Sequence, residues 1–209
     1  MPILYTIIII ILSILIASFM FYRFWFLRNP KISVPQGNSI VSPANGRIAR
    51  IVRIGEDIKE IEIKKHIGRI KALTSDTIKK GYLILIVMNV FNVHYQKAPI
   101  DGKVISVKHK KGKFLNAVSE AEDIRASFEN EKTETIIQTE IGKIKIIQIA
   151  GLVARRIVSF VKPEQKVIKG QDIGLIKLGS QVVLILPKLK LNIKEGQTVE
   201  AGKTIIAEY

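Results

Sequence analysis

The sequence predicts a mainly β protein, in which a single compact antiparallel β domain follows one transmembrane helix. The helix is predicted because no charged side chain occurs from Pro2 to Tyr22, a stretch long enough to cross a bilayer. The β domain is predicted because, after Pro35, short runs of aliphatic residues alternate with charged residues and are separated by glycines. Such a pattern is typical of strands.

The apolar segment is predicted to remain as a membrane anchor. It lacks the basic residues that precede the apolar part of a signal peptide, and no convincing small-residue cleavage site follows it. Arg23, Arg28 and Lys31 come directly after it, with Tyr22 and Trp25 at the boundary. The positive-inside rule then predicts that residues 1–27 anchor the chain in the cell membrane and that the domain over residues 28–209 is cytoplasmic.

The many short strands favour one antiparallel domain of about 180 residues. A short helix is predicted only over Ser119–Arg125. The runs predicted as strands are Arg47–Ile54, Ile58–Lys64, Leu83–Met88, Lys103–Val107, Thr135–Glu140, Lys143–Ile149, Gln181–Leu186 and Lys203–Glu208.

A weak internal repeat relates Val161–Leu175 to Ile193–Ala207. At one fixed offset it pairs Gln165 with Gln197, Val167 with Val199, and Gly170 with Gly202. Each copy resembles the half-motif of biotinyl and lipoyl domains, in which glycine permits a tight turn. Neither copy carries the lysine to which biotin or lipoate is attached, so a carrier function is excluded.

The composition of the chain excludes several kinds of functional site. The absence of cysteine excludes disulfides, zinc-thiolate sites, iron–sulfur clusters and a cysteine nucleophile. The net charge of +15 suits an anionic partner; no aromatic residues interleave with a basic cluster, which favours a membrane surface over nucleic acid. No phosphate-binding loop, dinucleotide motif or histidine pair at metal-ligand spacing is present, so no metal is predicted.

The strongest functional signal lies in irregular segments between the predicted strands. They are Ser42–Gly46, Asn92–His94, Ala98–Gly102, Gly112–Ala117, Gln148–Arg156 and Gly174–Ser180. Together with the arginine, Asn29 and Pro30 after the anchor, these ordered blocks resemble the phosphatidylserine decarboxylase family. The resemblance covers nearly the whole chain and is greatest to the compact bacterial and archaeal branch, which includes archaetidylserine decarboxylase-like proteins.

This resemblance implies a proenzyme that cuts itself between Gly179 and Ser180. The Ser180 hydroxyl would attack the carbonyl of Gly179, the peptide bond would become an ester, and elimination would cut the chain. Loss of ammonia would then leave a covalent pyruvoyl cofactor, derived from Ser180, on the fragment that ends at Tyr209. The two fragments would stay together as a two-chain enzyme. Without the family blocks, a Gly-Ser pair is most often a turn.

The resemblance also implies decarboxylation of a membrane phospholipid, phosphatidylserine or archaetidylserine, to the ethanolamine phospholipid. Ser180 and His94 are the predicted catalytic residues, because an imidazole exchanges protons near neutral pH. Arg155 and Arg156 are candidates for phosphate binding, although they could equally pair with carboxylates. His66 and His109 have no such support. Phe91, Phe114 and Leu115 could contact acyl chains or belong to the core.

The chain departs from the family at three positions. Asn45 stands at a candidate relay position where the family usually has aspartate, Lys97 stands where the longer branch has a second histidine, and Lys132 stands where arginine is common. A neutral Asn45 cannot stabilise an imidazolium by charge. Two other readings therefore stay open: an unprocessed, inactive phospholipid-binding homologue and a membrane-anchored, lipoyl-like transport adaptor.

Overall fold

The computed structural model describes residues 2–55, 67–112, 129–151, 156–177 and 180–209. The helices are α1 (Pro2–Met20), the π-helix η1 (Phe21–Phe26) and α3 (Ile67–Thr74). The strands of the first half are β1 (Ser39–Val41), β2 (Gly46–Ile54), β3 (Gly81–Met88), β4 (Tyr95–Lys97) and β5 (Gly102–Lys110). Those of the second half are β6 (Lys132–Thr139), β7 (Gly142–Ala150), β8 (Arg156–Ser159), β9 (Lys166–Val167), β10 (Asp172–Lys177), β11 (Ser180–Pro187), β12 (Lys190–Leu191), β13 (Thr198–Val199) and β14 (Ile205–Glu208).

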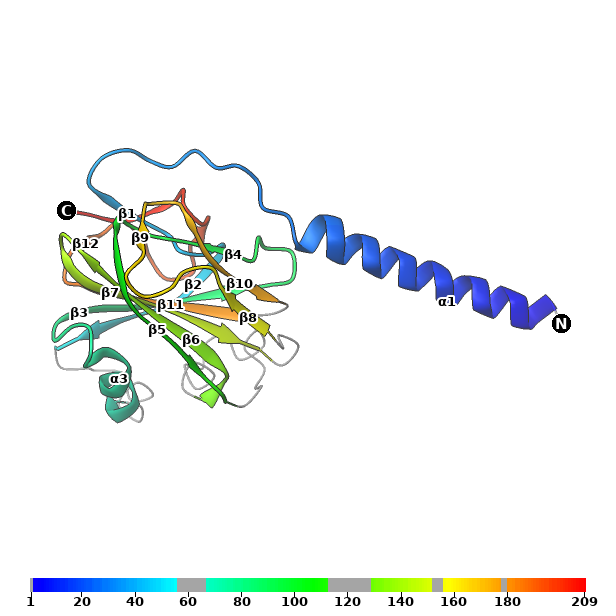
Figure 1. Cartoon of the computed structure of the whole chain (residues 1–209), viewed down its shortest axis with the longest axis horizontal. Coiled ribbons are helices and arrows are strands. Elements are labelled where there is room, and N and C mark those ends of the chain that lie inside the picture. Colours follow the sequence, from blue (N-terminus) through cyan, green and yellow to red (C-terminus); the bar gives the residue numbers. More distant parts are fainter. Residues whose placement is uncertain (1, 56–66, 113–128, 152–155, 178–179) are drawn as a thin grey trace.

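The amino-terminal helix projects away from a β body (Figure 1). The segment Ile3–Phe26 is 24 residues long and is apolar enough to cross a membrane. The side chains of α1 are exposed along its length, as expected of a helix that meets lipid and not a protein core.

The body is built on one eight-stranded antiparallel sheet, in the order β13-β2-β3-β11-β7-β6-β5-β9. Two three-stranded sheets, β1-β14-β12 and β4-β10-β8, complete it. The predicted mainly β, antiparallel fold class is confirmed. Strand β11 lies at the centre and pairs with β3 along its whole length and with β7 along most of it.

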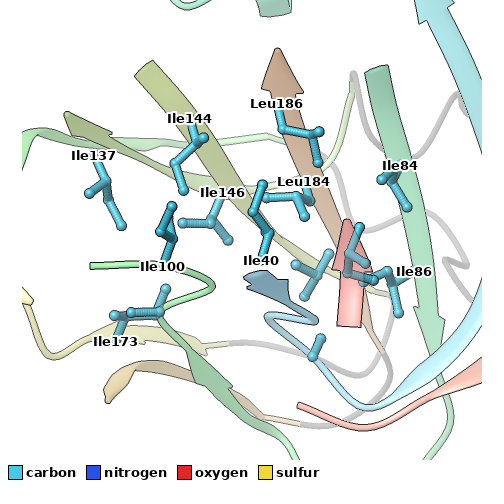
Figure 2. Packing of buried hydrophobic residues seen from close by; sticks show 14 of the residues in the cluster. Ile40, Ile84, Ile86, Ile100, Ile137, Ile144, Ile146, Ile173, Leu184 and Leu186 are labelled. Atoms are coloured by element: carbon cyan, nitrogen blue, oxygen red, sulfur yellow. The ribbon is translucent and has the colours of Figure 1, made fainter. Parts of the chain in front are cut away.

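Successive residues of the central strands face two different cores, because side chains alternate between the faces of a sheet. Ile84 and Ile86 of β3, together with Leu184 and Leu186 of β11, lie in the inner core (Figure 2). The residues between them lie in an outer cluster that α3 covers with Ile70 and Leu73. Burial on both faces explains why the sequences of these strands are continuous apolar runs.

The predicted strands are confirmed where the structure describes them, with end points that differ by no more than three residues. The predicted strand over Ile58–Lys64 and the predicted helix over Ser119–Arg125 lie outside the described residues. The expectation that no other short helix exists was wrong, because α3 is helical. Among the residues of that helix whose burial is described, Ile70, Leu73 and Thr74 are buried, a stripe too short to stand out in the sequence.

The internal repeat is present as a pair of equivalent turns. The side-chain Oε1 of Gln165 accepts a hydrogen bond from Lys162 N, and that of Gln197 accepts one from Lys194 N. The glycines of the repeat, Gly170 and Gly202, have φ angles of +83° and +71°, a region that disfavours residues with a β-carbon. The two copies therefore share their turn geometry as well as their sequence pattern.

The linker between the anchor and β1 lies against the body. A β-carbon on Gly170 would lie 2.4 Å from Val34 Cγ2, and one on Gly202 would lie 2.2 Å from Ile32 Cδ1. The linker thus packs one aliphatic side chain on each turn of the repeat, and the anchor is attached to the body along several residues.

A buried lysine fastens α3 to the sheet. Lys145 of β7 is 1% exposed, and its Nζ donates a hydrogen bond of 2.7 Å to the carbonyl oxygen of Leu73. It also pairs with Asp76 and lies 3.5 Å from Oε2 of Glu134, which is buried too. An ammonium group in this position is tolerated because carboxylates and a carbonyl surround it.

We expect Lys145→Ala to lower the free energy of unfolding by about 3 kcal/mol, because it leaves the buried Glu134 with less compensation. Lys143→Ala, on the same strand but exposed, should change it by less than about 0.5 kcal/mol. Urea unfolding of the full chain in detergent micelles measures both variants. Equal effects would show that the Lys145 ion pairs add nothing to stability.

Candidate active site

The loop between β3 and β4 is a compact turn held by its own asparagines. Asn89 Oδ1 accepts a hydrogen bond of 2.9 Å from Phe91 N, and Asn92 Oδ1 accepts one of 2.8 Å from Asn89 N. Asparagine side chains commonly close turns in this way. The loop, Asn89–His94, ends by delivering His94 into the interior, where it is fully buried.

The hydrogen bond of His94 determines its tautomer. Nδ1 lies 2.9 Å from the carbonyl oxygen of Asn92, and a carbonyl can only accept, so Nδ1 carries the proton. Nε2 then holds a lone pair. It is buried and has no hydrogen-bond partner within the described part of the chain. A buried acceptor without a partner is costly and is therefore a candidate for chemistry.

The last turn of the anchor covers the imidazole. Phe26 is fully buried, and its ring centroid lies 4.2 Å from that of His94. Tyr22 stacks on Phe26, with ring centroids 5.6 Å apart. Burial lowers the pKa of His94 to about 4; the Asn92 carbonyl opposes this shift, and the charge of Arg28 adds to it. The imidazole is therefore neutral at pH 7, with Nε2 able to accept a proton.

A buried polar chain leads from His94 into the inner core. Gln96 Nε2 donates to the carbonyl oxygen of His94 at 2.7 Å, and Gln148 Nε2 donates to Gln96 Oε1, also at 2.7 Å. A β-carbon on Gly174 would lie 2.5 Å from Gln148 Nε2, so this glycine makes room for the amide. The sequence assigned no role to Gln96, and it included Gln148 only as part of a family block.

Ser180 begins β11 next to this chain. Its backbone pairs with Met88 of β3 and Ala150 of β7, both members of the inner core. The sulfur of Met88 lies 3.9 Å from Gln96 Nε2. On the preceding strand β10, Ile176 N donates to the carbonyl oxygen of His94 at 3.2 Å. The β10–β11 connection therefore starts beside His94 and ends at Ser180; Gly179 lies outside the described residues.

Asn45 has a structural partner of its own. Its Oδ1 accepts a hydrogen bond of 3.1 Å from Ala201 N, in one turn of the repeat. Asp101 Oδ1 accepts an equivalent bond of 2.5 Å from Lys169 N in the other turn. The ring of His94 is oriented by the Asn92 carbonyl, so the described contacts give Asn45 a role in the turn, and its relay role stays a prediction.

Lys97 forms a clamp between the linker and the body. Its Nζ lies 2.6 Å from Asp172 Oδ1 and donates to Asn29 Oδ1 at 3.1 Å. Asn29 Nδ2 in turn donates to Asp172 Oδ2 at 2.7 Å. Lys97 and Asn45 border a common cavity of about 70 Å³. Lys97 thus holds the chain that follows the anchor.

The other candidate residues are dispersed. Arg156 is exposed at the start of β8, an edge strand, while Arg155 lies outside the described residues. His109 lies on β5 beside Thr133 and Glu131, and Lys132 is buried on β6, where burial lowers its pKa. Phe91 is 62% exposed, so it does not belong to the core. His66, Phe114 and Leu115 lie outside the described residues.

The described residues contain no group of three side chains suited to hold a metal ion. The site contains a buried neutral base and a polar chain that positions its backbone. The backbone of His94 also bonds to β10, the strand that precedes Ser180 in the chain. This arrangement suits proton transfer at the backbone near Ser180.

Comparison with known proteins identifies the family of the chain. The phosphatidylserine decarboxylase family model matches residues 19–207. The chain is 36% identical to the phosphatidylserine decarboxylase proenzyme of Syntrophus aciditrophicus over 188 residues, which cover 88% of this chain and 78% of that protein. It is 38% identical to a protein of Methanothermobacter thermautotrophicus described as "Putative archaetidylserine decarboxylase proenzyme", over 95% of this chain and 85% of that protein.

A third relative, the phosphatidylserine decarboxylase proenzyme of Burkholderia mallei, is 38% identical over 88% of this chain and 76% of its own length. The chain belongs to the phosphatidylserine decarboxylase family. The family resemblance carried by the blocks between the strands is thereby confirmed.

We expect the imidazole of His94 to titrate with a pKa of about 4, against about 6.5 for an unfolded histidine. Between these two values the unfolded chain binds more protons, so the contribution of His94 to stability is complete above pH 6.5 and is lost as the pH falls towards 4. Proton NMR of the micellar protein measures the titration, with the signal assigned by a His94→Gln variant.

The same measurement tests the role of Phe26. Phe26→Ala should raise the pKa of His94 towards 6.5, because it readmits water to the ring. Phe21→Ala, in the same helix but partly exposed, should leave it unchanged. An unchanged pKa in Phe26→Ala would mean that this ring does not desolvate His94.

Proposed function

We propose that this protein is a self-processing decarboxylase that converts phosphatidylserine or archaetidylserine to the corresponding ethanolamine phospholipid. The observation that carries the proposal is the neutral, buried His94. Its Nε2 has no partner among the described residues, and its own backbone bonds to the strand that leads to Ser180. The family membership of the chain gives this arrangement its chemical context.

The first task of the site is cleavage of the chain. In the proposal, Nε2 of His94 accepts the hydroxyl proton of Ser180 as its oxygen attacks the carbonyl of Gly179. The peptide bond becomes an ester, and elimination leaves Gly179 as a carboxylate and residue 180 as dehydroalanine. Hydrolysis releases ammonia. A pKa of about 4 leaves His94 unprotonated at pH 7, as a general base must be, although it also makes the imidazole a weaker base than an ordinary histidine.

The residues around position 180 fit the resulting pyruvoyl group. The backbone there is paired on both sides, which holds the new chain end in place after cleavage. The pyruvoyl ketone supplies the electron-accepting group that stabilises charge as the carboxylate of the lipid leaves. His94 can deliver to the product only a proton that Nε2 has first taken up. The two fragments remain one enzyme, because β11 of the shorter one pairs with β3 and β7 of the longer one.

Two features of the chain support a membrane lipid as the substrate. Arg155 and Arg156 are proposed to bind the phosphodiester, and the exposed side of Arg156 at an edge strand supports this assignment. The apolar helix is proposed to anchor the protein in the cell membrane, with the β body in the cytoplasm, because basic residues follow the helix directly.

Ser180→Ala tests the proposal directly. We expect the variant to remain a single chain of 23.5 kDa without decarboxylase activity, because alanine has no hydroxyl to attack Gly179. Ser75→Ala, a change of the same kind at an exposed position, should be cut and active like the wild type. Intact-mass measurement reads out both variants.

The outcome also separates the proposal from its nearest alternative. A wild-type protein that stays uncut in membranes would identify an inactive phospholipid-binding member of the family. A Ser180→Ala protein that still yields two fragments would refute self-cleavage at this bond.

Truncation tests the anchor and its boundary. Removal of residues 2–20 should release much of the body from membranes at about 1 M salt, where lysine attraction to lipid is screened, and leave His94 covered. Removal of residues 2–27 should release more of it, because Phe21, Phe24 and Trp25 are also lost, and should lower activity by about tenfold or more, because Phe26 is lost from the site. Fractionation and assays in micelles distinguish the two. A protein without residues 2–20 that is retained as strongly as the full chain would argue against the anchor.

A further inference from the structure

Exposed apolar residues gather where the anchor meets the His94 loop. The π-helix contributes Phe21, Phe24 and Trp25, which are 39%, 65% and 49% exposed. The loop contributes Val90 and Phe91, which are 39% and 62% exposed. These five side chains are called the interfacial patch below. Bulky apolar groups at this exposure need a partner other than water.

The two parts of the patch are fixed to each other. The rings of Phe21 and Phe91 meet edge to face, with centroids 6.3 Å apart and an interplanar angle of 81°. Arg28 Nη2 donates a hydrogen bond of 2.6 Å to the carbonyl oxygen of Phe91. Phe91 therefore lies level with the last turns of the anchor, at the same depth relative to the membrane.

That depth is the lipid–water boundary. The patch continues the apolar segment Ile3–Phe26 at the end that joins the body. Aromatic side chains are enriched at this level of a membrane. Arg23 lies over the ring of Phe24, and Arg28 lies over that of Trp25. Apolar rings with cationic groups beside them match acyl chains under anionic headgroups, which favours a lipid surface as the occupant of the patch.

We propose that the Val90–Phe91 loop inserts into the lipid surface beside the anchor and admits the lipid substrate to the site directly from the bilayer. His94 ends the same loop, so insertion of Phe91 sets the imidazole at the level of the phospholipid headgroups. The substrate then reaches the site without leaving the membrane. The insertion stands on the geometry of the patch, and the delivery of substrate rests on the proposed function.

Fluorescence measures the insertion without any assay of activity. Trp25 is the only tryptophan of the chain, so Phe91→Trp in a Trp25→Phe background provides a single probe. The full chain is placed in vesicles of phosphatidylcholine and phosphatidylglycerol whose acyl chains carry bromine close to the headgroup. Emission of the Phe91→Trp probe should be quenched by about half or more, because bromine quenches at contact, whereas water-exposed indole stays outside its reach.

Ile168→Trp in the same background is the matched control. Ile168 is 67% exposed and follows β9, which ends the eight-stranded sheet, and it is not part of the interfacial patch. Its emission should not change with brominated lipid. Equal quenching of both probes, or of neither, would overturn the insertion of the loop.

Kinetics test the delivery of substrate. Val90→Ser combined with Phe91→Ser should lower decarboxylation of long-chain phosphatidylserine in vesicles by about tenfold, since loss of about 1.4 kcal/mol of apolar contact has this effect. Its activity on dispersed dihexanoyl phosphatidylserine should fall by less than about twofold. Ile168→Ser should affect neither substrate. An equal loss on both substrates would overturn lateral delivery.

The two experiments fail in different ways. If the wild type is inactive on both forms of the lipid, the proposed function is wrong, while the quenching result still decides the insertion. If the wild type is active and the Phe91→Trp probe is not quenched, the insertion is wrong and the proposed function stands.

Discussion

Burial of the central strands on both faces is the constraint on which the rest of the structure depends. Because β3, β7 and β11 are covered by an inner core and an outer cluster, every residue of these strands has a fixed register and a fixed side. Polar side chains in such strands must find partners in the interior. Gln148 and Lys145 do so on opposite faces. The same pairing holds the backbone of Ser180 on both sides, so a cut before it would leave the sheet intact.

The contact of Phe26 with His94 links the apolar segment to the candidate active site. A tether alone would need no buried residue, yet the last turn of the apolar segment contributes a fully buried ring and the linker adds the Asn29–Lys97–Asp172 clamp. Removing water from the imidazole lowers its affinity for protons, so the apolar segment also affects the protonation of His94. In the proposed enzyme, membrane attachment and reactivity would therefore depend on the same few side chains.

Much of the fold could be predicted from the sequence. Aliphatic and charged residues alternate with the period of a strand, and glycines mark the turns between the strands. Leu83–Met88 and Gln181–Leu186 are strands as predicted. Helix α3 could not be predicted, since its buried stripe is very short and its position depends on Lys145, far away in the chain. At the site, the family blocks pointed to His94 and Ser180, whose catalytic roles stay a prediction. The Phe26 contact, the Gln96–Gln148 pair and the exposure of Phe91 arise from tertiary packing between distant segments, which local patterns do not encode.

The paired turns at Asn45 and Asp101 have a broader consequence. Both side chains do the same work, accepting one backbone N–H in each copy of the repeat, yet one is an amide and the other a carboxylate. The same turn geometry thus accommodates an amide in one copy of the repeat and a carboxylate in the other. The hydrogen bond to the turn alone gives no reason for aspartate at position 45. In the proposed enzyme, catalysis could therefore change at this side chain while the turn is kept.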